Sequence, residues 1–115
     1  MMTTMATGMA LVWTTLPGEA LANSVAETLV EEKLAACVHV LPGGRSCYRW
    51  QGEIHRDAEW TLLIKTRESL YPWLEPRLLA LHPYECPEIL MTPVLRSLPA
   101  YGEWLLAATR EPSSP

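Results

Sequence analysis

The feature that most constrains this chain is the order in which strand-like and helix-like periodicities follow one another. Four segments of the chain have either a continuous apolar run or apolar residues at alternate positions, as strands do. Between these segments apolar residues recur twice at the helical spacing of three and four residues, and a short helical pattern closes the chain. The predicted strands are 9–15, 35–50 (interrupted at 42–44), 53–66 and 88–95, and the predicted helices are 19–31, 69–81 and 101–109.

This order predicts a ferredoxin-like α+β sandwich, βαββαβ, with a C-terminal helix. Two split βαβ halves interleave into an antiparallel four-stranded sheet, and both longer helices lie on one face. We expect a single domain over residues 1–115, in which residues 1–8 are disordered and residues 111–115 form a tail.

The long hairpin predicted over residues 35–66 indicates an oligomer. Its strands exceed the usual five or six residues, so two helices of this size leave part of the hairpin uncovered. The exposed backbone and the side chains of Tyr48 and Trp50 then require burial against other subunits.

Prolines and glycines predict where the first elements break. Pro17 suits the first turn of the first helix, after which Glu19 favours the helix N-terminus. The Pro-Gly-Gly segment at 42–44 predicts a bulge or kink, and the Gln-Gly pair at 51–52 predicts a tight turn.

The second half of the chain carries similar signals. Thr66 or Ser69 is expected to cap the second helix, and Pro72 is tolerated near its start. Pro76 removes an interior hydrogen bond and predicts a kink. Pro93 predicts an edge position or an ending for the last strand.

Composition and charge exclude several classes of protein. Hydrophobic residues make up 49% of the 115 residues, which suffices for a core. The net charge of −4 and the scattered basic residues argue against a nucleic-acid partner. The three cysteines form no C-x-x-C spacing, and the chain has no signal-peptide pattern and no membrane-spanning run, so we expect a cytoplasmic protein with reduced thiols.

Five features together resemble the CutA divalent-cation-tolerance family, between about Val12 and Arg110. They are EKLAACV (32–38), YRWQG (48–52), IKT (64–66), HPYECPEI (82–89) and a late Trp104. The resemblance implies a cytoplasmic homotrimer whose sheets pack around a threefold axis. It also implies a non-enzymatic role in tolerance of copper and other divalent metals, with no required cofactor.

The resemblance also implies a metal-ligand set, namely a Cys at the end of the first strand and two adjacent His before Pro-Tyr. Thr14 and Leu81 stand at two of these positions, and His82 matches the third. Because a copper site takes two or more nitrogen or sulfur ligands, we expect weak binding in which neighbouring subunits supply ligands. The alternative is that the His82 ring satisfies backbone carbonyls at a helix end.

Two further residues are candidate metal ligands. Cys37 and His39, at i and i+2 on a strand, share a face, so a thiolate and an imidazole are placed to chelate one soft or borderline ion. Alternatively, Cys37 is a small core residue and His39 a packed or interface residue. Cys86 follows His82 in a proline-flanked loop and is a candidate exposed thiol.

A second candidate site follows from the resemblance, which implies a cleft between subunits. Lys65 is expected to pair with a carboxylate, either Glu59 or Glu88. The cleft then either holds a small anion or metabolite or fixes subunit register. The residues at the matching positions are Tyr48, Trp50, Glu59, Lys65 and Tyr84.

The sequence leaves two functions open and disfavours a third. The first is a trimeric protein of metal tolerance or response that binds metal ions, and an unidentified protein partner is compatible with it. The second is a signalling or scaffold trimer that resembles PII proteins and binds an anion or nucleotide, although no basic glycine-rich loop supports it. An enzyme is disfavoured, because no catalytic set of residues is evident.

Overall fold

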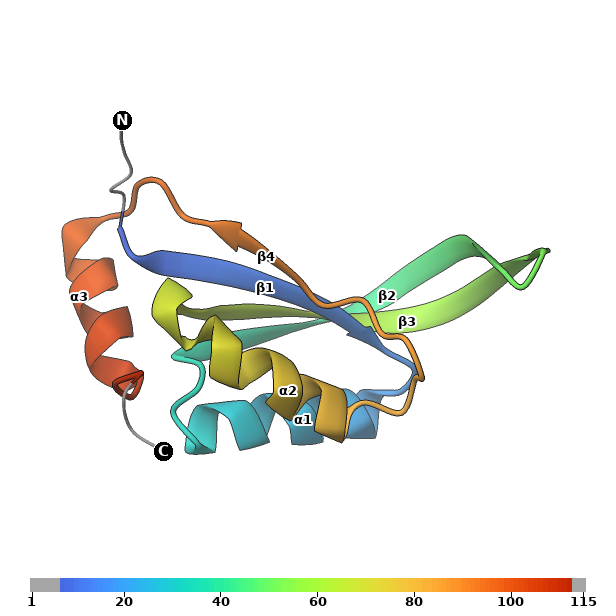
Figure 1. Cartoon of the computed structure of the whole chain (residues 1–115), viewed down its shortest axis with the longest axis horizontal. Coiled ribbons are helices and arrows are strands. Elements are labelled where there is room, and N and C mark those ends of the chain that lie inside the picture. The colour runs from blue at the N-terminus through green and yellow to red at the C-terminus, as the bar shows by residue number, and fades with distance from the viewer. Residues whose placement is uncertain (1–6, 113–115) are drawn as a thin grey trace.

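The computed structural model describes residues 7–112 and has one four-stranded sheet with three α-helices in that range (Figure 1). The elements are β1 (Met9–Leu16), α1 (Glu19–Glu31), β2 (Cys37–Trp50), β3 (Glu53–Arg67), the 3₁₀ turn η1 (Glu68–Leu70), α2 (Tyr71–Leu81), β4 (Leu90–Pro93) and α3 (Pro99–Ala108). None of the helices in this range is both long and apolar enough to span a bilayer.

The sheet has the strand order β2-β3-β1-β4, and every neighbouring pair is antiparallel. This is the arrangement of two interleaved βαβ halves, so the predicted α+β fold is confirmed. Strand β4 is shorter than predicted, and Pro93 lies on this edge strand as expected.

Helices α1 and α2 cover one face of the sheet and enclose the main core (Figure 1). Alternate residues of β1 and of the inner half of β3 point toward these helices, as the strand period requires. Two apolar side chains of these helices lie outside the core instead: Val30 is 42% exposed and Trp73 is 39% exposed. The core residues are Val12, Leu16, Ala22, Val25, Leu29, Leu34, Ala35, Leu62, Ile64, Leu70, Leu74 and Leu78.

The predicted helix starts were partly wrong. Gly18 is the N-cap of α1, so Pro17 precedes the helix rather than lying in its first turn. Helix α2 has no side-chain cap, because Leu70 occupies that position. Thr66 instead donates a hydrogen bond to the Leu34 carbonyl, and Ser69 lies in η1. Pro72 lies in the first turn of α2, as predicted.

Helix α2 runs without a break to Leu81 and contains Pro76. The predicted kink at Pro76 stays a prediction. His82 follows as the C-cap, in an extended conformation.

The β2–β3 hairpin contains both predicted irregularities. The register shifts between Leu41 and Gly44, which is the predicted bulge. A Cβ atom at Gly44 would lie 3.1 Å from the backbone oxygen of Glu59, so glycine allows this close approach. Gln51 and Gly52 form the tight turn with φ angles of 52° and 83°. The outer half of the hairpin projects well beyond the helices (Figure 1).

Helix α3 lies at the opposite end of the sheet from the hairpin tip (Figure 1). Its Leu105 packs with Met9 and Ala36 in a second cluster. The Arg67 guanidinium donates hydrogen bonds to Thr109 and to the Leu106 carbonyl, which joins β3 to the end of α3.

The predicted disordered segment 1–8 and the predicted tail 111–115 lie partly outside the described residues, at 1–6 and 113–115. Within the described part, Thr7 donates a hydrogen bond to the Val94 carbonyl at 2.6 Å, so the ordered chain begins earlier than residue 9. At the other end, Glu111 lies 3.8 Å from the Arg67 guanidinium.

Candidate functional site

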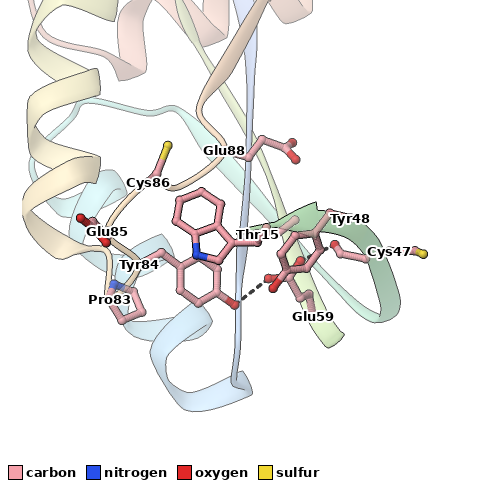
Figure 2. A pocket seen from close by; sticks show the side chains of 11 residues that line it. Thr15, Cys47, Tyr48, Glu59, Pro83, Tyr84, Glu85, Cys86 and Glu88 are labelled. Carbon is pink, nitrogen blue, oxygen red and sulfur yellow. Dashed lines mark hydrogen bonds between the residues drawn. The ribbon is translucent and has the colours of Figure 1, made fainter. Parts of the chain in front are cut away.

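A pocket of about 650 Å³ lies between the outer half of the β2–β3 hairpin and the loop that follows α2 (Figure 2). The hairpin reaches it because its strands continue past the bulge. The loop reaches it because Pro83 ends α2 and turns the chain. The lining residues are Thr15, Ser46, Cys47, Tyr48, Trp50, Glu59, Pro83, Tyr84, Glu85, Cys86 and Glu88.

Glu59 lies at the base of this pocket and is 6% exposed. Its carboxylate accepts hydrogen bonds from the Ser46 hydroxyl and from the Tyr84 hydroxyl, the latter at 2.6 Å (Figure 2). The ion pairs within residues 7–112 do not involve Glu59, so its negative charge has no Lys or Arg partner there. A buried carboxylate without such a partner attracts any cation that enters the pocket.

Two phenol groups of the pocket donate to carboxylates. Burial raises the pKa of Tyr84, and the hydrogen bond to Glu59 raises it further. The hydrogen bond to Asp57 raises the pKa of Tyr48, with a smaller contribution from burial. Both phenols therefore keep their protons at neutral pH and act as donors.

His82 connects the loop to β1 through both ring nitrogens. Its Nδ1 accepts the backbone N–H of Tyr84 at 3.2 Å, so Nδ1 carries no proton. The proton of the neutral ring is then on Nε2, which donates to the Thr15 carbonyl at 2.8 Å. Burial lowers the pKa of His82, while the Thr15 carbonyl and the Glu59 charge partly offset this effect. Metal ligation through Nδ1 requires the Tyr84 bond to break.

Cys37 and His39 lie on β2 on the face of the sheet that is turned away from α1 and α2, because the alternate residues Val38 and Val40 pack toward the main core. Cys37 is half-buried and His39 is exposed. Strand β3 separates β2 from β1, which contacts His82. Among the described residues, no three His, Cys, Asp or Glu side chains converge on one point as metal ligands.

Lys65 lies apart from the other residues of the predicted cleft. It lies six positions after Glu59 on β3, about 20 Å away at 3.3 Å per residue. Its ammonium nitrogen lies 5.8 Å from the centre of the Tyr101 ring. The predicted pairing with Glu59 or Glu88 is absent within one described chain, and pairing between subunits stays a prediction. The structure brings the other four together: Tyr48, Trp50, Glu59 and Tyr84.

Some pocket residues were missed in the sequence. Ser46 is two residues before Tyr48 and four before Trp50, and strand alternation places all three on one face. Strand alternation could therefore have predicted Ser46 as a residue of the pocket. Glu85 comes from an irregular loop, whose path no periodicity predicts, and Cys86 was named there only as a candidate exposed thiol.

Residues 10–108 match the family model of the CutA1 divalent ion tolerance protein. The Divalent-cation tolerance protein CutA of Thermus thermophilus is 48% identical over 79% of this chain and 88% of its own length. Protein CutA 1, chloroplastic, of rice is 42% identical over 88% of this chain but 57% of its own length.

Solved structures agree with the fold. The Cut A1 structure from Thermus thermophilus has a TM-score of 0.86 and 45% identity, and the match covers 89% of this chain and 99% of that chain. The CutA1 structure from Shewanella sp. SIB1 has a TM-score of 0.88 and 33% identity, with 93% and 100% covered.

Proposed function

The chain belongs to the CutA1 divalent ion tolerance family, and from this premise we propose that it is a non-catalytic homotrimer that binds divalent cations, copper included, with low affinity. We further propose that it works in the cytoplasm, where its three free cysteines stay reduced.

The observation that carries this proposal is the charge of the pocket. Glu59, Glu85 and Glu88 line it, and none of the lining residues is a lysine or an arginine. Carboxylates lined up in a partly enclosed site raise the local concentration of cations. Cys86 lines the pocket and offers a sulfur ligand, and His82, at the start of the same loop, offers a nitrogen ligand once the Tyr84 N–H releases its Nδ1.

Low affinity follows from the ligand geometry. No preformed three-ligand centre exists within residues 7–112 of one chain, so a tight site requires ligands from a second subunit. The Cys37 and His39 pair, on the sheet face turned away from α1 and α2, is the candidate for such a shared site.

The trimer is supported by the same sheet face. Trp13, Leu41, Leu63 and Leu90 occupy it, and Leu90 is 58% exposed. Helix α3 packs on one end of this face, and the rest of it is stabilised when other subunits cover it. The alternative function, in which an anion or nucleotide binds in the cleft, requires basic groups from another subunit to outweigh the glutamates.

Calorimetric titration of Cu(II) into the untagged, reduced protein tests the proposal. We expect saturable binding at a fixed ratio per trimer. His82→Ala and Glu59→Gln should each weaken it about tenfold, whereas Glu27→Gln, which removes the same charge from the outer face of α1, should leave it unchanged. Absence of saturable binding, or equal loss in Glu27→Gln, would contradict the proposal.

A further inference from the structure

We propose that the pocket beside Glu59 is a binding site for a linear aliphatic polyamine, a chain of ammonium groups joined by methylene segments. This inference concerns a second kind of ligand and does not rest on metal binding. Four properties of the pocket carry it: its hydrogen-bonding capacity, its spaced charges, its aromatic walls and its size.

Within one subunit, the pocket offers hydrogen-bond acceptors in excess. The hydroxyls of Ser46, Tyr48 and Tyr84 already donate their protons to carboxylates of the same chain. The oxygen atoms of these hydroxyls still have free lone pairs, and the Glu59 carboxylate has further free lone pairs. An ammonium group, with three donors and no acceptor, is the complement of such a surface.

The negative charges are spaced rather than convergent. Glu59 lies buried on β3, while Glu85 and Glu88 are exposed on the loop on the other side of the pocket (Figure 2). Because no three acidic, Cys or His side chains of the described chain meet at one point, a single small ion cannot contact all of these carboxylates. A ligand with several separated positive charges can.

Aromatic side chains form the walls between these charges. Tyr48, Trp50 and Tyr84 all line the pocket. Ring faces attract ammonium groups and also pack against methylene segments. A polyamine has both components, whereas a hydrated metal ion has neither methylenes nor an exposed organic cation.

The size of the pocket agrees with an extended ligand. Its volume of about 650 Å³ lies within the range of small-molecule sites, about 300–1,000 Å³. A single metal ion fills a small part of this space, while an alkyl chain with three ammonium groups occupies a larger part of it.

The alternative occupant of the pocket is the ammonium group of a lysine from another copy of this chain. Lys65 is the candidate, since within one subunit its ammonium contacts only the Tyr101 ring among the interactions found in residues 7–112. Therefore the experiment includes Lys65→Met. Spermidine binding that appears only in Lys65→Met would assign the pocket to the neighbour's lysine and overturn the proposal.

Calorimetric titration of spermidine into the intact, untagged protein at low ionic strength tests the site. Hexaamminecobalt(III) is the matched probe, because it carries the same charge of +3 without methylene segments. We expect saturable spermidine binding at least tenfold tighter than that of the cobalt complex. Equal affinities would show general charge attraction and would overturn the proposal, as would no binding of spermidine.

Matched variants locate the binding. Trp50→Leu should weaken spermidine binding about three- to tenfold, and Trp73→Leu, at an exposed tryptophan of α2, should not change it. Glu59→Gln should weaken it about tenfold, against Glu27→Gln as the control. If Glu59→Gln does not fold, Glu88→Gln replaces it. Equal effects of Trp50→Leu and Trp73→Leu would overturn the assignment to this pocket.

The two proposals fail separately. Binding of Cu(II) without binding of spermidine leaves the proposed function intact and overturns the polyamine site. Binding of spermidine without binding of Cu(II) does the reverse.

Discussion

Two buried threonines differ in whether their side-chain hydroxyl has a hydrogen-bond partner. Thr14 and Thr66 are both fully buried. The Thr66 hydroxyl donates to the Leu34 carbonyl at 2.6 Å, whereas the Thr14 hydroxyl has no partner among the described residues. An unpaired buried hydroxyl lowers stability, and a paired one raises it.

Valine substitutions at these positions should therefore change stability in opposite directions. We expect Thr14→Val to raise the free energy of unfolding by about 1 kcal/mol and Thr66→Val to lower it by about 1 kcal/mol. Urea denaturation at equal subunit concentration measures both. A destabilised Thr14→Val variant would show that its hydroxyl has a partner.

The burial of His82 predicts a dependence of stability on pH. Burial lowers its pKa below the ordinary value of 6.5, so the unfolded chain binds a proton more readily than the folded chain. The stability from the neutral ring is present above pH 6.5 and is lost as pH falls toward the folded pKa. Protonation of Nδ1 also ends its hydrogen bond with the Tyr84 N–H.

Urea midpoints measured from pH 7.5 to pH 5 test this effect. The wild type should lose more stability over this range than His82→Gln, which has no titrating group at the position. Parallel curves for the two proteins would contradict a buried neutral His82.

At the scale of the elements, the β2–β3 hairpin depends on its turn. Gln51 and Gly52 both have positive φ angles, a conformation that favours asparagine and glycine. Gln51→Asn should raise the free energy of unfolding by about 0.5 kcal/mol, and Gly52→Ala should lower it by about 1 kcal/mol. Chemical denaturation measures both free energies of unfolding. Gly43→Ala is the control, because Gly43 also has a positive φ angle but lies at the bulge instead of the turn.

The hairpin and the loop after α2 position the pocket together. Gly44 admits the backbone of Glu59 at the bulge, and the alternation of β2 then directs Ser46, Tyr48 and Trp50 to one face. The loop is fixed at its start by the two hydrogen bonds of His82. The site is therefore a property of two elements and not of a single motif.

At the scale of the whole molecule, the proposed trimer predicts which surface is sensitive to charge. Leu63 lies on the sheet face turned away from α1 and α2, and Leu79 lies on the outer face of α2 with 52% of its surface exposed. A lysine at position 63 would have to lose its water in a subunit interface, which is costly. We expect Leu63→Lys to give single subunits and Leu79→Lys to stay trimeric.

Light scattering at micromolar concentration measures the mass of each variant. A wild-type mass of one subunit would contradict the trimer, and a trimeric Leu63→Lys would place the interface elsewhere. A thermal midpoint that rises with subunit concentration is expected for the wild type, because association stabilises the folded state by mass action.

The type and order of the elements, the bulge, the tight turn and the edge position of Pro93 could all be predicted from the sequence. These features depend on local periodicity and on the backbone preferences of glycine and proline, which a sequence displays directly. The helix caps were less predictable, because Thr66 bonds to a carbonyl 32 residues away instead of capping α2.

Which residues of the candidate site meet depends on the folded chain and could not be predicted from the sequence. Tyr84 reaches Glu59 across 25 residues and His82 reaches Thr15 across 67, and no local pattern encodes such distances. The extended geometry of β3 likewise separates Lys65 from Glu59 within one chain, although both lie on the same strand. The reason is that contacts between distant segments depend on how the elements pack, whereas periodicity reports only which face of each element is buried.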